Sequence, residues 1–480
     1  MQYFFLALAA ALVILLCVLI VRAVRLKRKP AAAHEPVRVP VDTDAALDHF
    51  CQAVRLKTVW PRQGEIDYTQ FEAFLPLLQE MYPTFFAAVE VNRVNTYGIL
   101  LKWKGKSAEQ PIVLMAHYDV VAAEKDSWSC DPFCGEIRDG KVWGRGTLDT
   151  KCIITALLEA GELLAKEGYT PEHDIWFSFG NNEETGGDTV PAIVDWLQEH
   201  GVKPWFVLDE GGAVVTSPAL GVKGDYAMVG VSEKGVCDTI VTMHGLPGHS
   251  STPKDTDAPM RLVRAIERIE QKPDPAVLSE TTKYMLTEIA RDASFAMRLV
   301  FGNLWLFSPL VRKIMASNPE TNAMVRSTVA LTKLQGSDTV NVIPNEAVAA
   351  FSVRVAPWNT TQEMMDKIAA QAGEHADVTS EYRVEPSPVS PVKSDAFSLL
   401  QSVVDAVYPG VPAVPYVMNG GTDSKHFAAV WPNVYRFAGF RFTAEERAGM
   451  HGNDERLSVG SYLDGVRFYR KLLENLNKGE

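Results

Sequence analysis

The sequence predicts an α/β fold with a mixed sheet, interrupted by a smaller α+β domain. From residue 97 onward, short apolar segments alternate with segments of helical periodicity, which is typical of a largely parallel core with helical crossovers. Near residue 231 the order changes to βαββαβ, which fits a small split-βαβ domain. The 480 residues are 47% hydrophobic and 22% charged. This composition is globular and sufficient for two or three domains.

The elements of the larger domain follow from periodicity and from helix-ending residues. Residues 150–168 carry apolar side chains at helical spacing, and this helix should end at Gly168. We expect strands over 97–105, 111–121, 174–180 and 204–212, and helices over 43–56, 150–168 and 188–201.

The smaller domain should be a second α+β unit with a helical insert at about 276–325. Its strands are expected over 235–245, 328–336, 346–357 and 377–383, and its helices over 259–271 and 360–373. The chain therefore divides into an anchor (1–24), a linker (25–41), the larger domain (42–230 and 386–480) and the smaller domain (231–385).

The N-terminal residues predict a membrane anchor. Residues 3–21 carry no charge, and at about 1.5 Å per residue they nearly span a hydrocarbon core of about 30 Å. The basic cluster RAVRLKRK follows at once, whereas a cleaved signal peptide has its charges before the apolar run and a small-residue site after it. We expect an uncleaved single span. The positive-inside rule favours the cytoplasmic side for the large domain without deciding the orientation.

Charge and cysteine content exclude several classes of protein. With a net charge of −12, the chain is not expected to bind nucleic acid non-specifically. Its six cysteines, spread over a long chain, do not indicate a disulfide scaffold. Cys130 and Cys134 lack a second Cys or His pair at zinc-finger spacing, so we expect ordinary thiols.

Polar side chains with metal-binding chemistry follow several predicted strands. Ligands of open α/β sheets bind beyond the carboxyl ends of the strands. The residues at these positions, with one near the C-terminus, are His117, Asp119, Asp149, Glu183, Glu184, Asp209, Glu210 and His451. Each signal alone is weak, because an Asp before a helix is usually an N-cap and an HxD on a strand is usually structural. Their ordered combination is a stronger signal.

These residue types could build a two-metal site. His117 can offer a ring nitrogen to a metal, and Asp119, two residues on, points to the same side and can hold the other nitrogen. Asp149 has two oxygens and can bridge two ions. A carboxylate outside the ligand set must take the proton of the attacking water. Glu183 and Glu184 would divide these tasks, because adjacent side chains at a strand end point apart.

Eight short motifs occur in order along the chain: HYDVV, GRGTLDTK, NNEETGG, LDEGG, GHSSTP, NVIPN, GGTDSKHF and MHGNDE. Through these eight motifs the sequence resembles the M20 metallopeptidases, which are the clan of di-zinc aminoacylases and carboxypeptidases. The resemblance covers about residues 45 to 475. Within this family, the sequence is most similar to the carboxypeptidase S and N-acyl-amino-acid hydrolase branch. Members of that branch also have an N-terminal apolar segment and a long insert in the smaller domain.

The resemblance implies a di-zinc peptidase-like larger domain with a role for each residue above. The ligands of one zinc would be His117, Asp149 and either Asp209 or Glu210, since a one-residue register leaves that choice open. The ligands of the other zinc would be Asp149, Glu184 and His451. Glu183 would be the general acid/base, and Asp119 would orient His117. The family also implies a cis peptide after Asp149, and Co²⁺ or Mn²⁺ could replace Zn²⁺.

The smaller domain would act as a lid over this site. His249 could donate to the oxyanion that forms when water attacks a carbonyl, although the residues alone equally allow a histidine of a turn. Asn341 and Arg354 are implied contacts of a substrate carboxylate, which a guanidinium binds with two hydrogen bonds. Ser424 and His426, in a glycine-rich turn, would also face the substrate.

The predicted function is a membrane-anchored di-zinc hydrolase that cleaves an amide or peptide bond next to a free carboxylate. Small peptides or N-acyl amino acids would be the substrates, and a homodimer is compatible with the resemblance. The alternative is a non-catalytic ligand-binding or scaffold protein on the same fold. The intact set of ligands and base favours the enzyme, since a protein without catalysis need not keep these groups.

Overall fold

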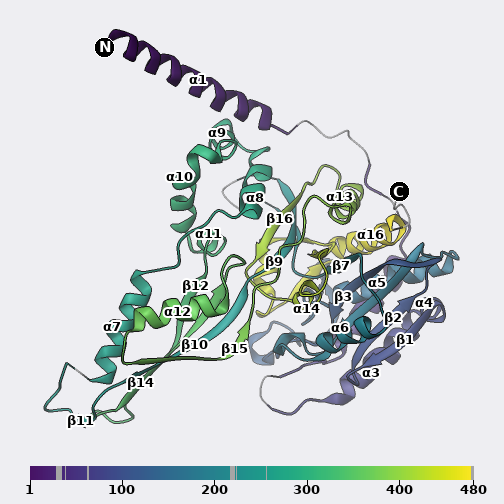
Figure 1. The fold of residues 1–480 in the computed structure, drawn as a ribbon. Helices are drawn as coiled ribbons and strands as arrows, with labels where there is room; N and C mark the ends of the chain where they lie inside the picture. Colours follow the sequence, from purple (N-terminus) through teal and green to yellow (C-terminus); the bar gives the residue numbers. More distant parts are fainter. Residues whose placement is uncertain are drawn as a thin grey trace.

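The computed structural model describes residues 1–28, 35–37, 39–61, 64–216, 222, 224–255 and 257–476. The protein has a larger α/β domain, a smaller lid domain and an N-terminal helix, α1 (Gln2–Leu26), that projects from the body (Figure 1). Part of the predicted linker, 25–41, lies outside the described residues.

The larger domain is built on one mixed sheet. Its strands are β1 (Val89–Val94), β2 (Gly98–Trp103), β3 (Ser107–His117), β6 (His173–Gly180), β7 (Phe206–Asp209), β8 (Ala213–Thr216), β9 (Asp225–Glu233), β16 (Ala413–Met418), β17 (Val434–Arg436) and β18 (Arg441–Phe442). Their order is β1-β2-β6-β3-β7-β17-β9-β8-β18, with β16 paired to β9. The central strands β6, β3, β7 and β17 are parallel, and the predicted fold class is confirmed.

Strand β3 explains why apolar runs predicted this sheet. Its Ile112 and Leu114 face one apolar core, whereas Val113 and Met115 face the core on the opposite side. A strand that is buried on both faces is apolar at every position. The run at 111–121 therefore predicted a strand although it does not alternate.

Helices cover both faces of the larger sheet. One face carries α2 (Thr43–Arg55), α4 (Pro83–Ala88), α5 (Lys151–Lys166), α13 (Asp395–Val407) and α16 (Val459–Asn475), with α3 (Tyr68–Met81) beside them. The other face carries α6 (Thr189–Glu199) and α14 (Ser424–Ala428). Helix α5 ends just before Gly168, whose φ of 73° suits glycine and stops the helix as predicted.

A small three-stranded sheet at the edge of this domain was not predicted from the sequence. It has the order β19-β5-β4, with β4 (Glu136–Arg138), β5 (Lys141–Trp143) and β19 (Arg456–Ser458), and α15 (Ala444–Gly449) precedes it. Each strand has three residues, too few for a periodicity signal. The pairing of β19 with β5 brings the C-terminal segment against the segment that leads to Asp149.

The lid domain has the predicted βαββαβ order. Its antiparallel sheet, β12-β14-β10-β15, is made of β10 (Gly235–His244), β12 (Thr328–Gln335), β14 (Glu346–Val355) and β15 (Ala376–Val384). One face packs on α7 (Ala258–Gln271) and α12 (Thr361–Ala372). An unpredicted pair, β11 (Gly248–His249) with β13 (Val342–Ile343), lies at the far end (Figure 1). The chain passes from one sheet to the other at Lys234, slightly after the expected residue 230.

The insert in the lid is helical. It contains α8 (Glu280–Ala290), α9 (Phe295–Phe301), α10 (Leu304–Ala316) and α11 (Pro319–Ala323), within the expected range of 276–325. Helix α8 packs on β16, and α9 packs against the C-terminal part of α1. The insert therefore lies between the larger domain and the N-terminal helix (Figure 1).

Candidate active site

His117, the last residue of β3, has different partners for its two ring nitrogens. Nδ1 lies 2.9 Å from the backbone oxygen of Asp119, and because a carbonyl only accepts, Nδ1 carries the hydrogen. Nε2 faces two carboxylates, Asp149 at 2.9 Å and Glu210 at 3.2 Å. A neutral ring with its hydrogen on Nδ1 has none on Nε2 to donate to these carboxylates, so without a metal the ring must take up a second proton. A cation between these three groups would satisfy all of them.

Asp149 stands at the start of α5, between two histidines. Its Oδ1 faces His117, and its Oδ2 lies 2.7 Å from Nε2 of His451. The peptide bond to Thr150 is cis. Oγ1 of Thr150 accepts from the N–H of His117 at 3.0 Å and donates to its carbonyl at 2.8 Å. The end of β3 is thereby fixed against α5, so His117 and Asp149 stay together.

The adjacent Glu183 and Glu184 lie on a 3₁₀ turn, Glu183–Thr185, that follows β6. The prediction that the two glutamates end the strand itself was wrong, because they lie on a short turn that follows it. Successive side chains on a 3₁₀ turn are about 120° apart, so the two carboxylates still point to different places. Oε2 of Glu184 lies 3.2 Å from Nε2 of His451.

Asp119 holds both the histidine and the glutamate pair. Its carboxylate accepts the backbone N–H groups of Glu183 and Glu184, each at 3.1 Å. The same carboxylate lies 3.4 Å from Nδ1 of His117, which is nearer to the backbone oxygen of Asp119. The role predicted for Asp119 is limited to orienting His117. Its hold on the 3₁₀ turn depends on the parallel pairing of β3 with β6.

A buried carboxylate, Glu455, ties the segment of His451 to the segment of Asp149. It accepts the N–H groups of Gly146 at 3.1 Å and Leu148 at 2.7 Å. It also accepts Nη1 of Arg145 at 2.7 Å, and Arg145 donates from Nη2 to the carbonyl of Gly452. Sequence reasoning gave Glu455 no role, because its partners lie about three hundred residues away in the chain.

At the end of strand β7, the two candidate metal ligands Asp209 and Glu210 point in different directions. Oε1 of Glu210 lies 3.2 Å from Nε2 of His117. Asp209, the preceding residue, turns the other way, and its Oδ2 accepts the N–H of Ser424 at 2.9 Å. The structure thus brings Glu210 into the cluster of His117 and Asp149 and places Asp209 beside the glycine-rich turn.

Glu233 holds the glycine-rich turn in place through hydrogen bonds. Its carboxylate accepts the N–H of Thr422 at 2.9 Å, Oγ of Ser424 at 3.1 Å and Nε of Arg436 at 2.6 Å. Ser424 is fully buried and uses its groups within the protein. His426 lies on α14, and burial lowers its pKa to about 4. Neither Ser424 nor His426 lines the cavity described below.

The donor atoms of this site fit metal ions. Two overlapping sets of ligand atoms lie within 4.8 Å of one another: His117, Asp149 and Glu184, and His117, Glu183 and Glu210. Oε1 of Glu184 is buried and has no hydrogen-bond partner in the described part of the chain. A buried oxygen without a donor is costly, and a cation would relieve that cost.

The electrostatics of the site also fit cations. Burial raises the pKa values of Glu183 and Glu210 well above the usual range, and neighbouring carboxylates add to this effect. Burial alone would lower the pKa of His117, but the charge of Glu210 and the hydrogen bonds that the ring donates to the surrounding carboxylates raise it well above its ordinary value. The site thus concentrates negative charge away from water. Two divalent cations would neutralise that charge.

A cavity of about 450 Å³ opens next to the cluster. Asp149, Glu183, Glu184, Glu210 and His451 line its polar end. Its apolar wall consists of Leu148, Ile153, Ala213, Val215, Met228, Met324, Tyr416, Val417, Met418 and Phe442. The site therefore combines a charged reaction centre with room for an apolar group.

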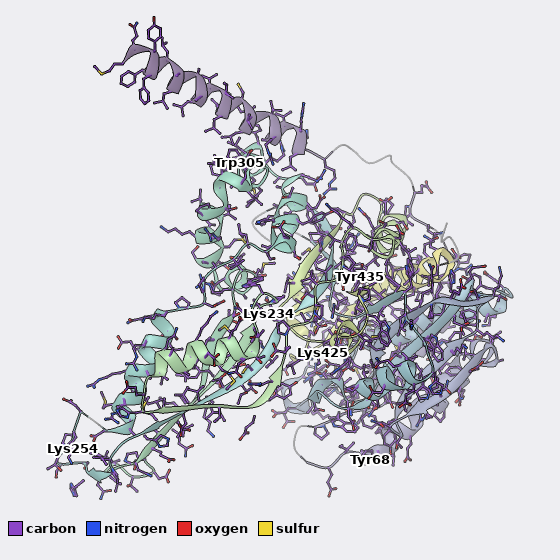
Figure 2. All side chains as sticks on the ribbon, viewed as in Figure 1. Tyr68, Lys234, Lys254, Trp305, Lys425 and Tyr435 are labelled. Carbon is purple, nitrogen blue, oxygen red and sulfur yellow. The ribbon has the colours of Figure 1, made fainter. Side chains whose placement is uncertain are left out.

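The residues expected to contact substrate from the lid lie away from this cavity. His249 is exposed in β11, and its Nδ1 accepts the N–H of Ser251 at 3.1 Å. Asn341 and Arg354 are also exposed in the lid. In Figure 2, Lys254, which closely follows His249, lies at the far end of the lid, whereas Lys425 lies in the larger domain. None of His249, Asn341 and Arg354 lines the cavity in this structure.

Comparison with known proteins agrees with this geometry. The pattern described as Peptidase family M20/M25/M40 matches residues 113–475. The chain belongs to the M20 peptidase family. It is 33% identical over 423 residues to a probable carboxypeptidase S-like protein of Dictyostelium discoideum, covering 87% of this chain and 81% of that one. It is 35% identical over 430 residues to an N-fatty-acyl-amino acid synthase/hydrolase of Xenopus tropicalis, covering 88% and 84%.

Solved structures share the fold of this M20 peptidase. A metallo-carboxypeptidase of the family from Sulfolobus solfataricus aligns with a TM-score of 0.66 at 14% identity, covering 90% of this chain and 99% of that one. A dinuclear metal-binding M20 peptidase of Bacillus subtilis aligns with a TM-score of 0.56 at 13% identity, covering 91% and 100%. Family and site together make the protein a metal-dependent hydrolase of amide or peptide bonds. The non-catalytic alternative is therefore set aside.

Proposed function

We propose that this M20 peptidase hydrolyses N-acyl amino acids with an apolar acyl group, at a pair of zinc ions. The observation that carries the proposal is the apolar cavity beside the carboxylate cluster. Burial of an acyl chain there supplies about 25 cal/mol per Å² of apolar surface, while the amide bond lies at the charged end. Relatives named as N-fatty-acyl-amino acid hydrolases support this substrate class.

The distances support a division of the ligands between two ions. We assign His117, Asp149 and Glu210 to the first ion and Asp149, Glu184 and His451 to the second. Nitrogen and carboxylate ligands suit Zn²⁺, and Co²⁺ or Mn²⁺ could replace it. When bound, the two ions would lower the pKa of a shared water and polarise the scissile carbonyl.

Glu183 is the proposed proton carrier. It would take a proton from the attacking water and give it to the departing amide nitrogen. A raised pKa suits this exchange near neutral pH, and Asp119 holds the backbone of Glu183 in position. His249, Asn341 and Arg354 would meet the oxyanion and the substrate carboxylate only after closure of the lid.

Helix α1 is the proposed membrane anchor, with no cleavage after it. Asn303 donates to the carbonyl of Leu19, Arg298 donates to that of Ala23, and Ala23 is fully buried against the insert. Removal of α1 would expose these groups, which favours its retention over a role as a signal sequence. The basic residues after it favour the cytoplasmic side for the body. Digestion by a protease added outside intact cells would contradict that orientation.

A substrate panel tests the proposed function. We expect kcat/KM to rise with acyl-chain length among N-acyl amino acids and to exceed that for dipeptides. Replacement Ala213→Phe, which fills the apolar wall, should lower kcat/KM for long acyl chains and leave an N-acetyl substrate unaffected. A preference for dipeptides would contradict the proposal. Elemental analysis should find two zinc ions per chain, and Asp149→Ala should lose both.

A further inference from the structure

Helix α10 of the insert is apolar on two opposite faces. Leu304, Val311 and Met315 are buried against the body. On the outer face, Trp305 is 57% exposed and Leu310 is 49% exposed, with Leu306 and Ile314 also exposed beside them. A surface helix normally turns a polar face outward. Several exposed apolar side chains on one helix mark a surface that binds a partner or a membrane.

The charge around this face is positive. Residues 293–319 contain no Asp or Glu, although the whole chain has a net charge of −12. Arg312 and Lys313 are exposed on α10 beside its apolar residues. An apolar helix surface flanked by basic side chains is typical of helices that lie in the interface of an anionic membrane.

The N-terminal end of α10 lies next to α1. Arg22 donates to the carbonyl of Gly302, in the bend between α9 and α10, at 3.0 Å. Asn303 in the same bend donates to the carbonyl of Leu19 at 3.1 Å. Figure 1 shows α10 running crosswise to α1 beside its C-terminal end, and Figure 2 shows Trp305 at that junction. A bilayer crossed by α1 would therefore meet α10.

A basic cavity of about 450 Å³ lies at the same junction. Three cationic side chains line it, Arg22 and Arg25 from α1 and Lys283 from α8, together with Trp305. The positive charge of the cavity fits the phosphate of a lipid headgroup. Trp side chains favour the level of the headgroups in a bilayer. Of the basic residues, Lys283 also pairs with Glu280 at 2.6 Å.

We propose that α9 and α10 dock on an anionic phospholipid bilayer. Trp305, Leu306 and Leu310 would lie at the boundary of headgroups and acyl chains, with lipid phosphates at the basic cavity. The proposal rests on the anchoring role of α1 and on the proposed function. It adds a route for substrate, because α11 follows α10 and supplies Thr321 to the wall of the active-site cavity. N-acyl amino acids dissolved in the bilayer would enter from its surface.

Tryptophan quenching tests the contact. Full-length protein is reconstituted into phosphatidylcholine and phosphatidylglycerol vesicles, with and without bromine on the acyl chains. Trp305 is the one exposed tryptophan among the described residues, so we expect bromine to quench the wild type and Trp358→Phe but not Trp305→Phe. Equal quenching of all three proteins, or none, would overturn the proposal.

Catalysis tests the consequence. We expect Leu306→Glu with Leu310→Glu to lower kcat/KM about tenfold for a long-chain substrate in vesicles, because two charges would enter the apolar boundary, and to leave a soluble N-acetyl substrate unchanged. The matched control is Met260→Glu with Val263→Glu on α7, whose side chains are 50% and 49% exposed. Equal loss in both double variants would overturn the docking.

The outcomes distinguish the docking of α10 from the two proposals on which it rests, the membrane anchor and the hydrolysis of N-acyl amino acids. Protein that floats with vesicles but shows no Trp305 quenching has its anchor and lacks the docking. Failure to float contradicts the anchor as well. Absence of N-acyl hydrolysis contradicts the proposed function, while quenching still reports on α10. A dimer that dissociates in the Leu306→Glu, Leu310→Glu variant would identify a second copy as the occupant and overturn the lipid proposal.

Discussion

At the scale of single residues, the site divides chemistry between neighbours that look equivalent in the sequence. Glu184 approaches His451, whereas burial raises the pKa of Glu183, the proposed proton carrier. Asp209 and Glu210 divide in the same way, one toward the glycine-rich turn and the other toward His117. In both pairs the backbone direction, and not the type of side chain, decides the role.

Replacement of Glu183 by Gln should remove the proton carrier and keep the shape of the site. We expect kcat to fall by about 10²- to 10⁴-fold, with the metal content of the wild type. Stopped-assay kinetics and elemental analysis on the same preparation measure both quantities. The matched replacement Glu184→Gln should instead lower metal content, and full activity of Glu183→Gln would refute the assignment.

Metal binding should release protons near neutral pH. The hydrogen bonds to Asp149 and Glu184 raise the pKa of His451 to about 10 in the metal-free protein. A raised pKa means that the imidazole stays protonated above its ordinary pKa, so a metal must displace that proton. Metal affinity should therefore rise with pH until the pH passes the raised pKa. Calorimetry in buffers of different ionisation enthalpy measures the release, and a buffer-independent heat would contradict it.

At the scale of elements, the reaction centre depends on how distant segments are tied together. Oγ1 of Thr150 joins the start of α5 to the end of β3, and Glu455 joins the segments around Asp149 and His451. These bonds position the proposed metal ligands Asp149 and His451. Loss of an outer partner of this kind typically lowers metal affinity by about 10–100-fold.

Glu455→Gln tests this tie. Its carboxylate and Arg145 are both buried and lie 2.7 Å apart, so the variant leaves a buried guanidinium without its counter-charge. We expect unfolding free energy to fall by about 3–5 kcal/mol and metal affinity by about 10–100-fold. Denaturant unfolding in detergent and metal competition measure these effects. Glu445→Gln, which removes an exposed partner of Arg456, is the control and should change stability by less than about 1 kcal/mol.

At the scale of the whole molecule, the smaller domain carries His249, Asn341 and Arg354, which do not line the cavity in this structure. Arg354 is exposed on β14, whereas Arg447 lines the cavity itself. If closure brings Arg354 to the substrate carboxylate, Arg354→Met should raise KM about tenfold for an N-acyl amino acid and leave its neutral amide unchanged. Arg383→Met on β15 is the surface control. An unchanged KM would move the carboxylate contact to Arg447.

The expected homodimer stays a prediction. The edge strand β12 is exposed along most of its length, and an exposed edge can pair with another chain. Mass photometry of the detergent-solubilised protein would measure the oligomeric state. A monomer at all concentrations would contradict the expectation.

The sequence by itself determined the elements and the chemistry of the site. Strands buried on both faces, such as β3, leave apolar runs, and amphipathic helices such as α5 leave a periodicity, so both are local signals. The ordered motifs predict His117, Asp149 and Glu184 as ligands of one site, and their side chains lie together in the structure. The three-residue strands β4, β5 and β19 leave no such signal.

Only the tertiary structure decided which atoms meet. The choice of Glu210 over Asp209 depends on the direction in which β7 turns its last side chains, and the role of Glu455 depends on contacts across about three hundred residues. The outward apolar face of α10 could not be told from its inward face by periodicity, because both faces are apolar. Burial distinguishes the two faces, and burial is a property of the folded chain.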